Sequence, residues 1–252
     1  MKTVGIIQAR MASTRLPGKV LVDVSGQPML HHVFSRAKQA RMLDHVVVAT
    51  SEEQSDNPIQ RFCEARGAEF FRGSHDDVLD RYHQAAKHFN ADIVVRLTAD
   101  CPLLDGEVID KVVEFFKEGS FDYVSNTLEC TYPDGLDTEV LSFAALKHSW
   151  REAKIKSERE HVTPYIRKRP ELFRLGNVRH TEDLSSFRWT VDEPRDLEFV
   201  RAVYNHFGSA TFGMKDVVKL LRNHPQMLEV NSGIDRNSGY RKSLREDGVF
   251  QY

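Results

Sequence analysis

Three cations and two hydroxyls gather on one short segment near the amino terminus of this chain. The segment follows the apolar run Val4 to Ile7, which predicts a buried strand. Its candidate binding residues are Arg10, Ser13, Arg15 and Lys19. Ligands of α/β proteins bind at the carboxyl ends of strands, and Arg and Lys suit phosphate oxygens, so the segment is a candidate phosphate cradle. The alternative is a loop of solvated charges.

The segment lacks the glycine pattern of two well-known phosphate loops. Gly18-Lys19 is followed by Val20 rather than by Ser or Thr. Ser13 stands where a Walker loop needs glycine, so that motif is excluded. Gly5 lies inside the predicted strand, and the second and third glycines of a dinucleotide fingerprint do not follow. Binding here would therefore depend on side chains more than on backbone amides.

Two aspartates follow predicted strands in the same way as the cationic segment does. Asp100 comes after the run Ile93 to Leu97 and Asp192 after the run Phe187 to Val191, each with a proline two residues further on. We expect both carboxylates at the sheet edge that carries the cradle, where one or two carboxylates plus substrate phosphates commonly hold Mg²⁺. Each could instead cap a helix, as we expect Asp105 to do.

The bulk composition narrows the class of protein. The chain has 252 residues and a formal net charge of -2, which argues against a general nucleic-acid binder. Cys63, Cys101 and Cys130 have no paired spacing, so they suggest neither a disulfide framework nor a zinc site and fit a reducing cytosol. No apolar run approaches the roughly 18–20 residues of a membrane span, and no signal peptide precedes the first strand. We expect a soluble cytoplasmic protein with neither a membrane nor a nucleic acid as partner.

The order of the remaining elements predicts an α/β fold with a mostly parallel sheet. Apolar runs alternate with stretches of helical period, which is the pattern of βαβ units. Further strands are expected at 46–49, 123–125, 138–141 and 173–178, and helices at 31–39, 59–66, 77–89, 108–117, 159–169, 196–206 and 214–221 and from residue 143. No linker or repeat divides the chain, so residues 1–231 are predicted to form one domain and residues 232–252 a polar, loosely held tail. The alternative for the tail is that Arg236, Tyr240 or Lys242 closes a site.

Several motifs resemble the sugar cytidylyltransferases, the family that includes the CMP-KDO and CMP-sialic acid synthetases. Residues 9–19 are similar to the triphosphate-binding signature of that family, and residues 191–198 to its metal-binding Asp-x-Pro-x-Asp-Leu-Glu segment. Within the family the resemblance is greatest to the spore-coat polysaccharide biosynthesis protein F branch. The motifs that carry it are residues 72–74, 76–81, 98–102, 132–137 and 159–164.

This resemblance implies a single-domain fold of the nucleotide-diphospho-sugar transferase type, Rossmann-like and related to GT-A enzymes. It also implies an Mg²⁺-dependent transfer of CMP from CTP to an acidic or otherwise modified sugar, with release of pyrophosphate, for surface polysaccharide or glycan biosynthesis by a homodimer. The resemblance assigns the phosphates to Arg10, Ser13, Arg15 and Lys19, the metal to Asp100 and Asp192, and the surroundings of the nucleotide to Thr98 and Ala99. Catalysis would then be carried by Arg10, Lys19, Asp100 and Asp192.

The acceptor side departs from the better-known synthetases. Asp134, Asp137 and Glu139 occupy one short stretch, and Arg159 and His161 follow later. We take these five residues as candidates for sugar binding. Three acids would disfavour a substrate with a carboxylate unless they meet hydroxyls, an amine or a metal. The alternative is a turn aspartate followed by solvated strand charges.

Two other functions stay open at this stage. A glycosyltransferase of the same general fold would use a finished nucleotide sugar, but such enzymes usually bring the metal through an Asp-x-Asp sequence. Here Asp100 is followed by Cys101-Pro102. A nucleotide-binding protein without catalytic activity would not need both aspartates together with the complete cationic segment.

Overall fold

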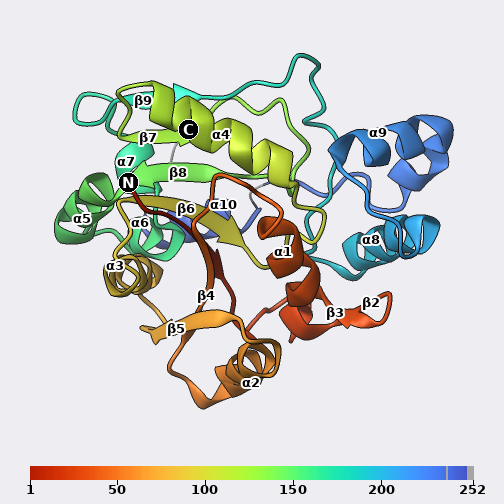
Figure 1. Ribbon diagram of the computed structural model, residues 1–252, viewed down its shortest axis with the longest axis horizontal. Helices are drawn as coiled ribbons and strands as arrows, with labels where there is room; N and C mark the ends of the chain where they lie inside the picture. Colours follow the sequence, from red (N-terminus) through yellow and green to blue (C-terminus); the bar gives the residue numbers. More distant parts are fainter. Residues whose placement is uncertain (237, 249–252) are drawn as a thin grey trace.

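A seven-stranded sheet forms the centre of the computed structural model, which describes residues 1–236 and 238–248. The strand order is β5-β4-β1-β6-β8-β7-β9 (Figure 1). The strands are β1 (Thr3–Gln8), β4 (His45–Ser51), β5 (Glu69–Gly73), β6 (Ile93–Thr98), β7 (Tyr123–Ser125), β8 (Glu139–Ser142) and β9 (Leu175–Asn177). Strand β8 runs antiparallel to both of its neighbours, and the other pairs in the sheet are parallel. The predicted α/β class with a mostly parallel sheet is confirmed.

The two faces of the sheet pack against different helices, because side chains alternate along each strand. On β1, Ile7 belongs to one apolar cluster and Ile6 to another. The cluster around Ile7 takes side chains from α1 (Met29–Ala37), α2 (Asn57–Arg66) and α4 (Gly106–Glu118). The cluster around Ile6 takes side chains from α3 (Val78–His88), α5 (Phe143–Glu152) and α7 (Pro164–Arg167). Both faces are therefore covered, and Figure 1 shows α1 and α3 on opposite sides of β4.

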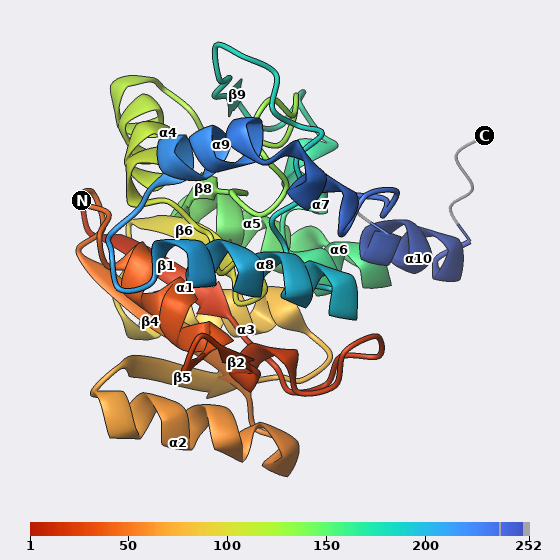
Figure 2. The ribbon, with the colours of Figure 1, turned by 90° about the vertical axis from the view of Figure 1, so that its right-hand side faces the viewer.

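A third apolar cluster lies beyond the sheet, around the fully buried Trp189. It is built by α8 (Pro194–Phe207) and α9 (Met214–Asn223), together with Val24 of the hairpin formed by β2 (Asp23–Val24) and β3 (Gln27–Pro28). Figure 2 shows α8 and α9 near each other, with α10 (Ser238–Glu246) next to α6 (Lys156–His161). The short 3-10 helices are η1 (Lys19–Leu21), η2 (Gln54–Asp56) and η3 (Pro225–Glu229). Within the described ranges, no helix has the length and apolar character needed to cross a membrane.

Two of the predicted elements differ in the structure from what the sequence indicated. The helix predicted at 159–169 is divided into α6 and α7, because Val162 adopts a positive φ of 71° between them. The strand predicted at 187–191 forms only an isolated bridge between Arg188 and Asp134. Its backbone pairs instead with two separate loops, since Trp189 N donates to Asp134 O at 2.6 Å and Val191 N donates to Asp100 O at 2.8 Å.

The segment predicted as a loose tail contains helix α10 in its described part. Ser243 on this helix donates to Glu160 at 3.0 Å and lies 2.9 Å from the His161 imidazole. The Asp247 carboxylate accepts from Ser157 N at 3.2 Å. These contacts hold the segment against α6, while residues 237 and 249–252 of the predicted tail lie outside the described residues.

Candidate active site

Lys19 brings the two aspartates that follow the central strands to one point. Its ammonium group donates to Asp100 Oδ2 at 2.9 Å, to Asp192 Oδ1 at 2.8 Å and to Val191 O at 2.7 Å. The Lys19 side chain is only 11 % exposed. Two carboxylates from distant parts of the chain therefore share one buried cation.

This ion cluster keeps its members charged. Burial alone would lower the pKa of Lys19, but the charges of Asp100 and Asp192 outweigh it and raise the pKa above its usual value. Burial alone would raise the pKa of Asp100, but the Lys19 charge and a hydrogen bond from Thr98 lower it to about 2. At neutral pH the point between the carboxylates therefore attracts positive charge.

Of the two arginines of the amino-terminal segment, Arg15 contacts this cluster, whereas Arg10 lies near α6. Arg15 reaches Asp192 at 3.0 Å and Glu193 at 3.6 Å, with its side chain 36 % exposed. Arg10 is 45 % exposed and lies 3.9 Å from Glu160 on α6. The hydroxyl of Ser13 accepts from the backbone of the same loop. The two arginines are thus accessible to a phosphate group, as a cradle requires.

Asp192 is not used to cap the helix that follows it, so its carboxylate is available to bind a cation. Glu193, not Asp192, is the N-cap of α8, and Asp196 completes a capping box with it. Asp105 caps α4 as expected, by accepting from Glu107 N and Val108 N. The alternative role of Asp192 as a helix cap is therefore not supported.

Arg188 is a buried residue of this site that the sequence analysis missed. Its guanidinium donates to Asp134 at 2.9 Å, to Asp192 at 3.1 Å and to Asp196 at 2.8 Å. The Arg188 side chain is 8 % exposed. Asp134 reaches it because Gly135, at φ +111°, lets the backbone of Trp189 approach so closely that an added Cβ would clash. Arg188 thus helps to fix the orientation of Asp192 through Oδ2, whereas Lys19 binds Oδ1.

The candidate nucleotide neighbours lie at the end of β6. Ala99 is buried, and its backbone N donates to Gln8 O at 3.1 Å. The Thr98 hydroxyl lies 3.2 Å from Cys101 Sγ. Both residues are therefore within a few positions of Asp100 and next to the end of β1, although neither contact by itself selects a base.

The donor set fits a hard divalent cation. Asp100 Oδ2 and Asp192 Oδ1 both lie within hydrogen-bond distance of Lys19 Nζ, so a cation that displaced this ammonium could take an oxygen from each. Among residues 1–236 and 238–248, no cluster of three or more His, Cys, Asp or Glu side chains has metal-binding geometry. Two carboxylates suffice for Mg²⁺ when substrate phosphates supply further ligands.

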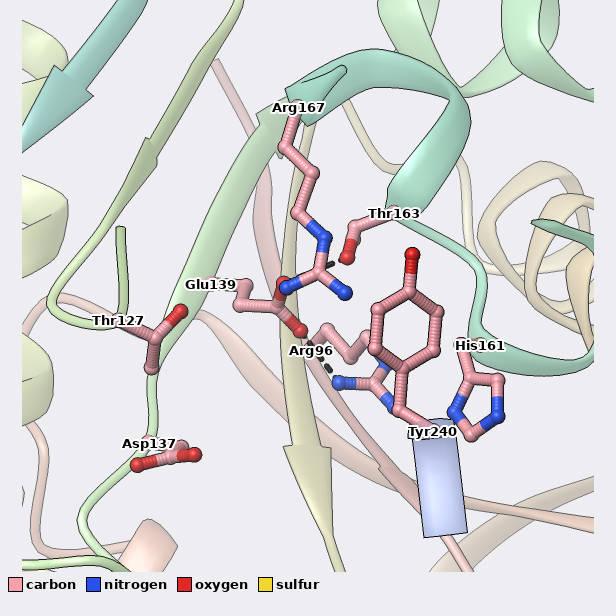
Figure 3. A pocket seen from close by; sticks show the side chains of 8 residues that line it. All are labelled: Arg96, Thr127, Asp137, Glu139, His161, Thr163, Arg167 and Tyr240. Carbon is pink, nitrogen blue, oxygen red and sulfur yellow. Dashed lines mark hydrogen bonds and ion pairs between the residues drawn. The ribbon is translucent and has the colours of Figure 1, made fainter. Parts of the chain in front are cut away.

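Most of the candidate acceptor residues surround a polar pocket beside this cluster. Figure 3 shows the side chains that line it, namely Arg96, Thr127, Asp137, Glu139, His161, Thr163, Arg167 and Tyr240. Glu139 is almost fully buried and forms an ion pair with Arg96. It also accepts from the hydroxyls of Tyr123 and Thr163, both at 2.6 Å. Asp134 lies next to the pocket and is 3.7 Å from Arg236.

Arg159 is not among the residues that line this pocket. Its guanidinium binds Asp77 at 2.6 Å and donates to the carbonyls of Trp150 and Ala153 at 2.9 and 3.1 Å. Arg159 therefore connects the N-terminus of α3 to the end of α5. We interpret it as a structural residue rather than a sugar ligand.

The fold and the site define the chain as a nucleotidyltransferase. The family model described as Cytidylyltransferase matches residues 4–228, so the chain belongs to the cytidylyltransferase family and the resemblance seen in the motifs is confirmed.

Individual relatives agree with this family. The spore coat polysaccharide biosynthesis protein SpsF of Bacillus subtilis is 33% identical over 230 residues, which cover 87% of this chain and 94% of that protein. A 3-deoxy-manno-octulosonate cytidylyltransferase of Geobacter metallireducens is 26% identical over 241 residues, 94% of this chain and 84% of that protein. The solved structure of a cytidylyltransferase from Leptospira borgpetersenii superposes with a TM-score of 0.88 at 33% identity, covering 94% of this chain and 100% of that one.

Proposed function

We propose that this protein transfers CMP from CTP to the anomeric hydroxyl of a sugar, with Mg²⁺ as the metal and pyrophosphate as the second product. The observation that carries the proposal is the meeting of Asp100 and Asp192 at the Lys19 ammonium, with Arg15 also bound to Asp192. Two relatives support a sugar as the acceptor, since one acts on 3-deoxy-manno-octulosonate and the other serves spore coat polysaccharide synthesis.

The proposed reaction forms one bond and breaks one. The sugar oxygen bonds to the α-phosphorus, the bond from that phosphorus to the bridging oxygen breaks, and the hydroxyl proton passes to solvent. Negative charge grows on the departing pyrophosphate, where Lys19, Arg10 and Arg15 would stabilise it. Mg²⁺ held by Asp100 and Asp192 would add Lewis-acid stabilisation of the phosphate oxygens. Arg188 keeps Asp192 oriented throughout, because it also binds two further carboxylates.

The proposal extends to the setting expected from the resemblance. We propose a homodimer in the cytoplasm that supplies an activated sugar for a surface polysaccharide or glycan. Support for the pathway comes from the name of the Bacillus subtilis relative. Light scattering after size-exclusion chromatography tests the homodimer, and a mass of one chain would contradict it.

Pyrophosphate release measured with CTP, MgCl₂ and a panel of acidic, amino and neutral sugars tests the activity. We expect CTP to be used, and Asp100→Asn and Asp192→Asn to abolish most of the turnover. Asp183→Asn is the matched control, because this aspartate is exposed and its carboxylate accepts from Ser185 N in its own loop. Turnover only with a preformed nucleotide sugar would instead indicate a glycosyltransferase. Stabilisation by CTP without turnover of any sugar would indicate a binding protein.

A further inference from the structure

The Lys19 ammonium lies at the point where a metal ion held by the two aspartates would have to bind. Its Nζ is 2.9 Å from Asp100 Oδ2 and 2.8 Å from Asp192 Oδ1, and Val191 O completes a set of three oxygens at 2.7 Å. Mg²⁺ binds oxygen at about 2.0–2.1 Å, so an ion that takes both carboxylate oxygens would lie close to the present position of the ammonium. Because like charges repel, the two cations cannot share this point.

The proposed reaction gives Lys19 a second task that its present contacts prevent. There the ammonium stabilises the departing pyrophosphate, while Asp100 and Asp192 hold the metal. A lysine ammonium has three N–H donors, and Lys19 directs all three at the oxygens of Asp100, Asp192 and Val191. Lys19 must therefore leave the carboxylates before it can bind a phosphate.

The two carboxylates are held in place by contacts that do not involve Lys19. The backbones of the two segments are joined directly, since Val191 N donates to Asp100 O at 2.8 Å. Arg188 donates to Asp192 Oδ2 at 3.1 Å, which is the oxygen that Lys19 does not use. Both contacts remain when the ammonium leaves, so the two free oxygens would still face one point.

The Lys19 side chain can turn away from this point without a movement of the backbone. Lys19 N donates to Leu16 O at 3.2 Å, and Gly18 precedes it with φ 69°, so the main chain is fixed at the start of η1. The ammonium is attached to it by a flexible four-carbon stem. A phosphate bound along the same segment, near Ser13 and Arg15, would therefore be within the range of positions open to the ammonium.

We propose that Lys19 couples the binding of the metal to the binding of the nucleotide. In the enzyme without nucleotide, the ammonium occupies the cation point between Asp100 and Asp192, and the triphosphate of CTP draws it away so that the metal can enter. This inference rests on the proposed function. A metal that enters alone must displace the ammonium from both carboxylates, whereas the triphosphate supplies new acceptors for it. Metal and CTP should therefore bind cooperatively, each raising the affinity for the other by the same factor.

Mn²⁺ binding followed by electron paramagnetic resonance, in the absence of any sugar, tests this inference. Without nucleotide, Lys19→Met should bind Mn²⁺ at least about tenfold more tightly than the wild type, because no charged hydrogen bonds have to be broken. CTP should tighten Mn²⁺ binding to the wild type by about 5–150-fold, after correction for the Mn²⁺ that CTP binds in solution, and by a smaller factor in Lys19→Met. Lys19→Gln, which keeps a polar side chain, should also bind Mn²⁺ more tightly than the wild type.

Arg15→Met is the matched control for the loss of a positive charge. Its guanidinium belongs to the same segment and lies 3.0 Å from Asp192 Oδ1, but its side chain is 36 % exposed. Removing this more exposed ion pair should tighten Mn²⁺ binding by about threefold or less. The double variant Lys19→Met/Asp100→Asn locates the ion, since it should lose the tight site that Lys19→Met gains.

The outcomes separate this inference from the proposed function. Equal affinity of the wild type, Lys19→Met and Lys19→Gln for Mn²⁺ without nucleotide would overturn the inference and leave CMP transfer intact. The same holds if Arg15→Met matches Lys19→Met, if the double variant keeps the tight site, or if CTP leaves the affinity of the wild type for Mn²⁺ unchanged. Absence of pyrophosphate release with every sugar would overturn the proposed function, whereas the titrations without nucleotide would still decide whether Lys19 occupies the metal point.

Discussion

Replacing Lys19 by Met tests the cluster at the centre of the site. The substitution keeps the apolar stem of the side chain and removes an ammonium that holds Asp100 and Asp192 at 2.9 and 2.8 Å. The two carboxylates would then face each other without their shared cation. The protein should lose stability in the absence of metal, and a divalent cation should bind between the carboxylates without having to displace the ammonium.

The expected loss of unfolding free energy depends on how deeply the two carboxylates are buried. Removing one partner of a buried ion pair costs about 3–5 kcal/mol. The two carboxylates are 28% and 23% exposed, so water can solvate them in part, and we expect a smaller loss of about 2–3 kcal/mol. Millimolar MgCl₂ should restore much of the lost free energy of unfolding, because a ligand at a hundred times its Kd stabilises the folded protein by about 2.7 kcal/mol.

Urea unfolding with EDTA and with MgCl₂ measures both effects. The control is Lys215→Met, which removes an exposed ion pair with Glu107 at 3.5 Å and should change the free energy of unfolding by less than about 0.5 kcal/mol in either buffer. If Lys19→Met is as stable as the wild type in EDTA and does not respond to MgCl₂, the two carboxylates do not share a cation, and the metal assignment loses its basis.

Three further predictions concern the same site and its surroundings. Asp100→Asn and Asp192→Asn should each lower kcat by about 10²–10³-fold with an unchanged circular dichroism spectrum, and normal turnover in both would contradict a catalytic role. Arg159→Met should cost about 2–3 kcal/mol in urea unfolding, because it frees a carboxylate and two carbonyls, but should leave the acceptor KM of the folded enzyme unchanged; a raised KM would show sugar binding instead. Folded His161 has a pKa of about 4, below the ordinary value of 6.5, so the native state binds fewer protons than the unfolded chain between these values. Wild-type stability relative to His161→Gln should therefore be full above pH 6.5 and fall by up to about 3 kcal/mol as the pH drops to 4, and parallel pH profiles would argue against a buried neutral imidazole.

Local pattern was sufficient for most of the sheet and for one side of the site, but it missed the edge strand β5 (Glu69–Gly73). Apolar runs such as 93–97 can be recognised because a strand buried on both faces has few polar positions. The residues that follow these runs gather at one edge, since parallel strands end there, and this placed Lys19 and Asp100 in the same prediction. The same reasoning located Asp105 as a helix cap from its position before an apolar helix.

Other features depend on which distant residues meet, and no local pattern carries that information. The run 187–191 has strand composition, but its backbone bonds to the loops at Asp134 and Asp100 instead of to a strand of the sheet. The helix at 159–169 is broken at Val162, a residue whose own preference disfavours positive φ, so only tertiary packing could impose the turn.

The charge of the acceptor pocket also depends partly on the sequence and partly on the tertiary structure. The sequence by itself determined that acids stand at 134, 137 and 139 and that a cationic segment follows the first strand. Only the folded chain decided that each of those acids meets an arginine, and that Arg188 is shared by Asp134, Asp192 and Asp196. The physical reason is that an ion pair depends on distance and burial in three dimensions, whereas hydrophobic period depends on neighbours along the chain.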